Sequence, residues 1–364
     1  MASTAAARHA PQPLPRGLLI VLGVAATVIA IGGMRTAAGI IGPTVLALVL
    51  TIAVHPMRGH AARVGVPAWA GTLVGIVTVY VVLLLLAASL VIAVARFATL
   101  MPSYQDKFDE LLQSGLDTLA GYGVSRDQIN DITSSFDVGQ AVSVAGSALN
   151  GALSLTSNLL FIITLLLFMG IDAAHLPGKL EAARGERPAV VAALDAFADG
   201  TRRYLVVSTV FGLIVAVLDT AFLAFTPVPV PLLWGLLAFI TNYIPNIGFV
   251  IGLVPPAILG LLEGGPWLML LIIAVYSVLN FVIQSVVQPK FVGDSVGISG
   301  TLTFLSLVFW AWVLGPLGAL LAVPLTLLVK ALLVDVDPDS RWLSRLLSGS
   351  KDDGEPAATQ PGAV

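Results

Sequence analysis

Amide side chains recur at a helical spacing along one apolar segment of the chain. Asn280, Gln284 and Gln288 are each four residues apart, and Ser277 extends the row. Positions four apart lie on one face of an α-helix, so the pattern predicts a polar stripe on an otherwise apolar rod. Amides both donate and accept hydrogen bonds. The stripe could therefore bind a polar solute along a hydrated path, or join neighbouring helices within a membrane.

A second group of polar and helix-breaking residues interrupts a long apolar run. Residues 232–262 would form a helix about 46 Å long, whereas the hydrocarbon core of a bilayer is about 30 Å thick. Near the middle of the run stand Asn242, Pro245, Asn246 and Gly248. Proline removes a backbone donor and disfavours helix at the residue before it. We therefore expect two half-helices around a break at membrane depth.

The same pattern recurs in residues 300–333, which would measure about 51 Å as one helix. Gly315, Pro316 and Gly318 interrupt this run. Irregular backbone at membrane depth is tolerated only inside protein or along a watery cavity, and paired broken helices are typical of transporter binding sites. Both runs could cross the membrane fully, but their length favours re-entrant hairpins. We expect the two breaks and the stripe to line a solute or ion pathway, with simple packing kinks as the alternative.

Asp219 is an acidic residue well inside a hydrophobic run. Intramembrane carboxylates are costly, and they usually face a cavity or a partner. Asp219 could carry a proton or help to hold a cation, which would make it a coupling residue. The alternative is a structural aspartate that a neighbouring helix satisfies near the outer end of its span.

The sequence lacks the motifs of catalysis, nucleotide binding and metal binding. It has no H-E-x-x-H, no G-x-S-x-G and no P-loop. It has no cysteine, its four histidines are scattered, and its net charge of −3 does not suggest a nucleic-acid partner. We therefore expect no enzyme activity, no metal and no cofactor, and transport driven by an ion gradient rather than directly by ATP.

Composition indicates the class of fold. Hydrophobic residues make up 57% of the chain and charged residues 11%, with a mean hydropathy of +0.96. A soluble domain carries about 25% charged residues, so most of this chain needs lipid as its solvent. The prediction is an all-α, polytopic integral membrane bundle with two broken segments and a small external helical insertion.

Charge and hydropathy divide the chain into an ordered series of segments. Basic stretches precede the first span, join spans two and three and join spans four and five, so the positive-inside rule places both termini in the cytoplasm. The acidic insertion could equally be a plain connector. The expected segments are a disordered tail (1–16), spans one to three (17–95), the acidic external insertion (96–137), span four (138–173), a cytoplasmic amphipathic region (174–203), the remaining spans (204–334) and a cytoplasmic tail (335–364). Within 204–334 we expect span five, the broken segment 232–262, an unbroken span 267–289 and the broken segment 300–333.

Three stretches resemble a known family of bacterial permeases. They are Tyr-Ile-Pro-Asn-Ile-Gly at 243–248, Val-Gln-Pro-Lys-Phe-Val-Gly at 287–293 and Leu-Gly-Pro-Leu-Gly-Ala-Leu-Leu-Ala-Val-Pro-Leu at 314–325. With the layout of spans, they make residues 15–335 similar to the autoinducer-2 exporter family. The resemblance implies a multi-pass permease of the inner membrane that forms a homo-oligomer, with a pentamer as the implied number. Members are associated with export of the signal autoinducer-2, and others with sodium/proton exchange.

The leading hypothesis is a secondary permease that moves a small polar solute or signalling molecule by alternating access. Two alternatives belong to other classes. One is a cation/proton antiporter that uses Asp219. The other is a non-transporting membrane scaffold that binds partners through residues 96–137 or 174–203.

Overall fold

The computed structural model describes residues 15–104, 159–288 and 299–337, except for residues 64, 66, 174 and 246, and also a few isolated positions between 105 and 158. All regular secondary structure in these ranges is helical. The expected site residue Asn246 lies outside the described residues, as do most of the external insertion, the first half of span four and the C-terminal tail beyond residue 337.

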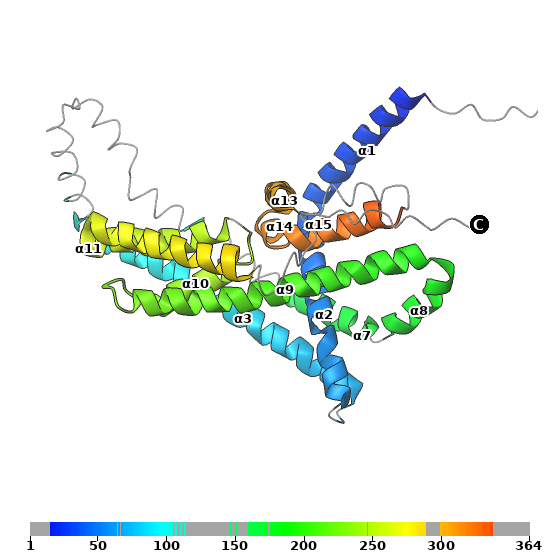
Figure 1. The fold of residues 1–364 in the computed structure, drawn as a ribbon, viewed down its shortest axis with the longest axis horizontal. Coiled ribbons are helices and arrows are strands. Elements are labelled where there is room, and N and C mark those ends of the chain that lie inside the picture. The colour runs from blue at the N-terminus through cyan, green and yellow to red at the C-terminus, as the bar shows by residue number, and fades with distance from the viewer. Residues whose placement is uncertain are drawn as a thin grey trace, which may run out of the picture.

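The N-terminal part consists of three helices. They are α1 (Arg16–Thr36), α2 (Ala38–Arg63) and α3 (Ala68–Leu100), which a short 3₁₀ turn, η1 (Met101–Tyr104), extends. Only Ala37 separates α1 from α2. In Figure 1 the first half of α1 projects away from the bundle, while its second half reaches α13. There the guanidinium of Arg35 lies 4.8 Å from the ring centroid of Trp312.

The next three helices run from the end of span four through span five. Helix α7 (Leu159–Asp172) bends by 61° into α8 (Leu176–Glu186), and α9 (Pro188–Leu223) follows. Arg187 breaks the helix between α8 and α9 with φ −136° and ψ 62°, and Pro188 then occupies the first turn of α9. Because no proline interrupts the rest of α9, one helix about 54 Å long continues from the amphipathic region into span five.

The first broken segment is a helical hairpin. Helix α10 (Pro231–Thr241) ends before the turn at 242–247, and α11 (Gly248–Phe281) begins after it. A Cβ on Gly248 would lie 1.8 Å from the carbonyl oxygen of Thr241, and a Cβ on Gly252 would lie 3.1 Å from the Cα of Ala238. The contacting residues thus rise in number along α11 while they fall along α10. The two helices therefore pack antiparallel and in close contact.

Helix α11 folds back on itself at Gly265, whose φ of 75° and ψ of −172° are not helical. A Cβ on Gly260 would lie 2.4 Å from Cδ1 of Ile272, although residues 12 apart in a straight helix are about 18 Å apart. The two arms of α11 therefore lie side by side, as Figure 1 shows. The second arm continues into a π-helical turn, η2 (Val282–Val287), so the span expected to be regular over 267–289 widens near its end.

The second broken segment is also a hairpin. Helix α13 (Gly300–Leu314) ends at Gly315, which has φ 68°, and α14 (Pro316–Leu320), α15 (Ala322–Lys330) and a π-turn, η3 (Ala331–Asp335), follow. A Cβ on Gly318 would lie 1.9 Å from the carbonyl oxygen of Trp310. The indole of Trp310 donates to Thr326 Oγ1 at 3.1 Å, which ties α13 to α15.

The two largest apolar cores hold most of these pieces together. The first joins α2, α7, α13 and α15, and the second joins α3, α10 and both arms of α11 around Trp234 and Tyr276. Within the part of the chain that the structure describes, four helices can cross a membrane by length and composition, or five if the bent pair α7–α8 is one span. The outer surface carries many exposed aliphatic side chains. The predicted all-α, multi-pass membrane fold is therefore confirmed.

Candidate functional site

A polar cavity of about 240 Å³ lies beside the turn of the α10–α11 hairpin. Three other elements complete its wall, namely α9, the end of the second arm of α11 and the start of α13. The lining residues are Tyr204, Ser208, Asn242, Ile244, Pro245, Phe249, Gln284, Gln288, Gly300 and Thr303. None of these side chains is charged, so the cavity offers neutral hydrogen-bonding groups beside a few apolar surfaces.

Gln284 connects the polar stripe to the hairpin turn. Its Nε2 donates to Oδ1 of Asn242 and to Oδ1 of Asn280, both at 3.0 Å. Asn280 in turn donates to the carbonyl oxygen of Tyr276 at 2.9 Å, and Asn242 donates to the carbonyl oxygen of Ser208 at 3.2 Å. This chain of bonds fixes three elements relative to one another. The Oε1 of Gln284 and the amide of Gln288 make no hydrogen bond with another described residue, so both groups can bind a solute.

Two tyrosines anchor the turn to α9. The hydroxyl of Tyr204 donates to the carbonyl oxygen of Tyr243 at 2.7 Å, and the hydroxyl of Tyr243 lies 2.7 Å from Thr209 Oγ1. The turn keeps only part of the helical hydrogen-bond pattern, because Tyr243, Ile244 and Ile247 bond to carbonyls two or three residues back. Buried backbone groups without partners are costly. Tyr204 supplies one of the missing partners.

Gln284 lies within the π-helical turn η2, and Gln288 directly follows it. π-Bulges in helices occur frequently at functional sites, because they change the register of the residues that follow. Despite the change of register, both glutamines line the same cavity. Ser277, the fourth residue of the predicted stripe, is not among the lining residues.

The second broken segment does not contribute its tip to the polar cavity. Gly315 and Pro316 form the helix break, and Gly318 packs against the backbone of Trp310. The neighbouring Leu317 lines a separate apolar cavity of about 310 Å³ between α2, α3 and α7, which Tyr243 also lines. The two hairpin tips are therefore neighbours, but the structure brings only the first into contact with the polar stripe.

Asp219 is completely buried, at 0% exposure, and lies away from the polar cavity. It is 11 residues from Ser208 on α9, which corresponds to about 16 Å along the helix. Neither carboxylate oxygen has a hydrogen-bond partner among the described residues, and the same is true of the hydroxyl of Tyr276. Asp219 is close enough to Tyr276 to interact with it electrostatically. The backbone of Tyr276 also accepts the bond from Asn280, so these two buried groups adjoin the end of the amide chain.

Sequence reasoning did not single out Tyr276, Tyr204 or Ser208 as site residues. A signal for Tyr276 was available, since residues 276, 280, 284 and 288 continue the four-residue spacing without a gap. Tyr204 and Ser208 carry no comparable signal, because they meet the hairpin turn only through packing between distant helices.

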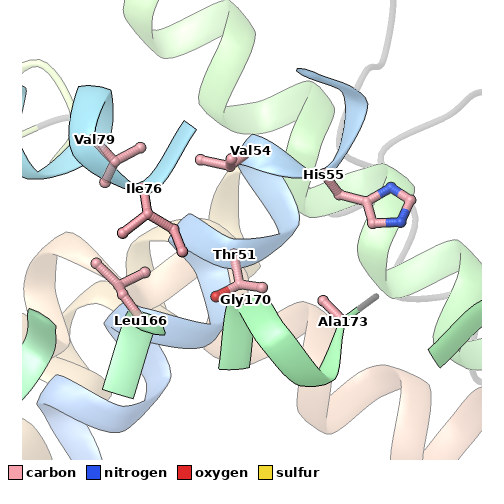
Figure 2. A pocket seen from close by; sticks show the side chains of 8 residues that line it. All are labelled: Thr51, Val54, His55, Ile76, Val79, Leu166, Gly170 and Ala173. Atoms are coloured by element: carbon pink, nitrogen blue, oxygen red, sulfur yellow. The ribbon is translucent and has the colours of Figure 1, made fainter. Parts of the chain in front are cut away.

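Among the described residues, no group of three or more His, Cys, Asp or Glu could hold a metal ion. A gap of about 20 Å³ between α2, α3 and α7 has room for about one water molecule (Figure 2). Its wall is largely apolar, and Figure 2 shows the imidazole of His55 turned away from Ile76, Val79 and Leu166. This gap is too small for a solute.

Fold and site together define a multi-pass helical membrane protein with a neutral polar cavity next to a broken helix. The chain belongs to the family described as AI-2E family transporter, whose model it matches over residues 18–336. The resemblance noted from the sequence motifs is thus confirmed.

Several bacterial proteins are similar to most of the chain. The AI-2 transport protein TqsA of Escherichia coli is 34% identical over 317 residues, which cover 86% of this chain and 91% of TqsA. The putative transport protein YhhT of Escherichia coli is 29% identical over 357 residues, covering 97% and 99% of the two chains. A putative transport protein of Haemophilus influenzae is 28% identical over 343 residues, covering 91% and 96%. The protein is therefore a membrane transporter by family.

Proposed function

We propose that this protein is a secondary permease of the inner membrane that binds a small, uncharged polar solute in the polar cavity. The observation that carries the proposal is the set of neutral donors and acceptors around Gln284, two of which have no partner among the described residues. Binding sites typically combine apolar walls with a few well-placed polar groups. The residues proposed to contact or shape the pathway are Asn242, Pro245, Asn246, Gly248, Asn280, Gln284 and Gln288, with Gly315, Pro316 and Gly318 shaping the second hairpin.

Alternating access would use the hairpins as moving parts. The α10–α11 hairpin is attached to α9 through Asn242 and Tyr243, and to the second arm of α11 through Gln284. The sharp turn at Gly265 permits the first arm of α11 to move relative to the second. We propose that solute replaces the bond between Gln284 and Asn242, which releases the hairpin and opens the cavity to the other side.

A transport assay on purified protein in liposomes tests the site. The relative TqsA is named as an AI-2 transport protein, so autoinducer-2 is the first solute to assay. We expect Gln284→Leu to abolish uptake, because it removes the amide at the centre of the cavity, and Gln284→Asn to retain partial activity. Ser277→Leu is a matched control outside the cavity and should transport normally. Normal uptake by Gln284→Leu would refute the proposed site.

A second candidate function is cation/proton antiport through Asp219. The observation that favours it is the buried carboxylate, whose two oxygens lack partners among the described residues. Such a group is expensive in the ionised state unless a cation or proton joins it. A Na⁺ pulse on dye-loaded proteoliposomes should then drive proton flux in the native protein and none in Asp219→Asn. The absence of flux under every cation gradient would remove this candidate.

The orientation and the assembly of the protein are two further proposals. We propose that both termini face the cytoplasm, because the basic stretches that separate the early spans fall on one side. We also propose a homo-oligomer, with a pentamer as the number that the family resemblance implies. Native mass spectrometry of the purified protein would give the number of chains directly, and a monomer would contradict the proposal.

A further inference from the structure

A second, larger cavity of about 780 Å³ lies between α2, α7, α8 and α9. It is separate from the polar cavity, because the two use different faces of α9. Arg202 lines the larger cavity, whereas Tyr204 and Ser208 line the polar one. With 3.6 residues per turn, Arg202 and Tyr204 point in nearly opposite directions.

The wall of this cavity changes character along its depth. Its inner part is apolar and includes Leu48, Ile52 and Met169, which belong to the spanning parts of α2 and α7. Its outer part begins where these spans end and carries charged side chains from α7, α8 and α9. From Leu48 to the end of the span at His55, α2 rises about 10 Å. An apolar floor under a charged rim at this level matches the boundary between acyl chains and headgroups.

The rim carries charges of both signs, and some of them have no protein partner. Arg184 pairs with Asp195 at 2.8 Å and with Glu181 at 3.4 Å. In contrast, Lys179 and Asp172 form no ion pair within the described residues, and both lie on the rim. A phosphate with a nearby ammonium group complements one free cation and one free anion, whereas a purely anionic headgroup would meet the acidic side chains of the rim as well.

Arg202 offers a donor that the protein itself does not use. Its Nη1 donates to Oδ1 of Asp199 at 3.0 Å, while its Nε is buried and has no hydrogen-bond partner among the described residues. A buried donor without a partner destabilises the folded state. The side chain of Arg202 is 32% exposed, so its guanidinium can donate a charge-assisted bond to a phosphate oxygen in the cavity.

We propose that this cavity binds one phospholipid with an ethanolamine headgroup, taken from the leaflet that the basic stretches favour as cytoplasmic. Lys179 and Arg202 bind the phosphate, Asp172 binds the ammonium group, and the acyl chains lie against Leu48, Ile52 and Met169. The cavity volume is within the range of about 300–1,000 Å³ that ligand sites occupy. The bound lipid would brace α8 against the bundle, because α8 packs mainly on α9.

Native mass spectrometry on the purified, delipidated full-length protein in detergent tests this site. Titration with phosphatidylethanolamine should load one molecule per chain at a concentration at least about tenfold below that needed for phosphatidylglycerol with the same acyl chains. Glycerophosphoethanolamine and inorganic phosphate, which lack acyl chains, should not compete at matched concentrations. Equal loading of the two phospholipids, or displacement by either soluble compound, would overturn the proposal.

Variants locate the site within the molecule. Lys179→Gln and Arg202→Gln should each weaken loading at least about tenfold, since each removes a charge-assisted bond to the phosphate. Arg203→Gln is the matched control, because Arg203 adjoins Arg202 but does not line the cavity. Met169→Trp fills the apolar floor and should reduce loading with every charge in place. Unchanged loading in Lys179→Gln and Arg202→Gln, or an equal loss in Arg203→Gln, would refute this site.

Discussion

Gln284 is the residue on which the geometry of the polar cavity depends most. Its amide nitrogen bridges two asparagine oxygens on different elements, while its own oxygen stays available. Low dielectric strengthens such bonds, and it also makes an unsatisfied group costly. The same amides can therefore position the hairpin when the cavity is empty and bind solute when it is filled.

Asn242 should be sensitive to truncation for this reason. Asn242→Ala removes the acceptor for Gln284 and the donor to the carbonyl oxygen of Ser208. We expect a loss of about 1–3 kcal/mol in the free energy of unfolding and a higher KM for transported solute. Thermal unfolding in detergent measures the first effect, and a liposome uptake series measures the second. A variant that matches the native protein in both would show that the bonds are incidental.

Gly248 is restricted by space rather than by hydrogen bonding. In Gly248→Ala the new Cβ would overlap the carbonyl oxygen of Thr241, which is backbone and cannot rotate away. We expect the hairpin to open, with a loss of about 3 kcal/mol or more. Gly23→Ala is the control, because nothing lies within 4 Å of that position. Size-exclusion profiles at increasing temperature should separate the two variants, and similar profiles would contradict the tight approach of α10 and α11.

At the scale of elements, the first broken segment consists of two arms. Each arm is too short to cross a membrane by itself. Helix α10 is about 16 Å long and the first arm of α11 about 25 Å, against a hydrocarbon core of about 30 Å. Their antiparallel packing leaves residues 242–245 of the break partly buried among the helices. That environment is the one in which irregular backbone is tolerated at membrane depth.

Gly315 shows how backbone conformation sets the second hairpin. Its φ of 68° and ψ of −148° lie in a region that only glycine adopts readily, and nothing lies within 4 Å of an added Cβ. Gly315→Ala should therefore cost about 1–3 kcal/mol through strain alone. Gly300→Ala has equal space but an ordinary backbone, and we expect no loss there. Equal melting temperatures for the two variants would rule out the strained turn.

At the scale of the whole molecule, several chain segments meet at one end of the bundle. The hydroxyl of Tyr104, at the end of α3, donates to the carboxylate of Glu263, and Lys107 lies 3.3 Å from the same carboxylate. Glu263 is two residues before Gly265, so the turn at Gly265 lies at the end of α3. This arrangement supports the proposal that the α10–α11 hairpin is re-entrant in a membrane, with its base at this end and its tip within the bundle.

Sidedness can be tested directly because the native chain has no cysteine. Phe225 is 90% exposed in the loop before α10, and Trp267 is 78% exposed after the turn at Gly265. A re-entrant hairpin places both on the same side of the membrane, so Phe225→Cys and Trp267→Cys should react with an impermeant maleimide from the same compartment. Labelling from opposite compartments would show that the segment crosses fully.

Much of the site followed from local sequence, but the partners of the stripe did not. The spacing of Asn280, Gln284 and Gln288 indicated one face of a helix, and Pro245 with Gly248 indicated a break. That α9 supplies Tyr204 and Ser208 depends on contacts between residues about 40 positions apart. No periodicity in either segment contains that information.

The sequence by itself determined the solvent of this protein, its helical class and the positions of its two main interruptions. The reason is that lipid requires every backbone group of a segment to be satisfied within it or nearby, which is a local constraint. Only the tertiary structure decided that α11 folds back at Gly265, that the second tip lies apart from the amide stripe, and that Asp219 is buried near Tyr276. Those outcomes depend on which apolar faces pack together, and many helix pairings satisfy the same hydropathy pattern.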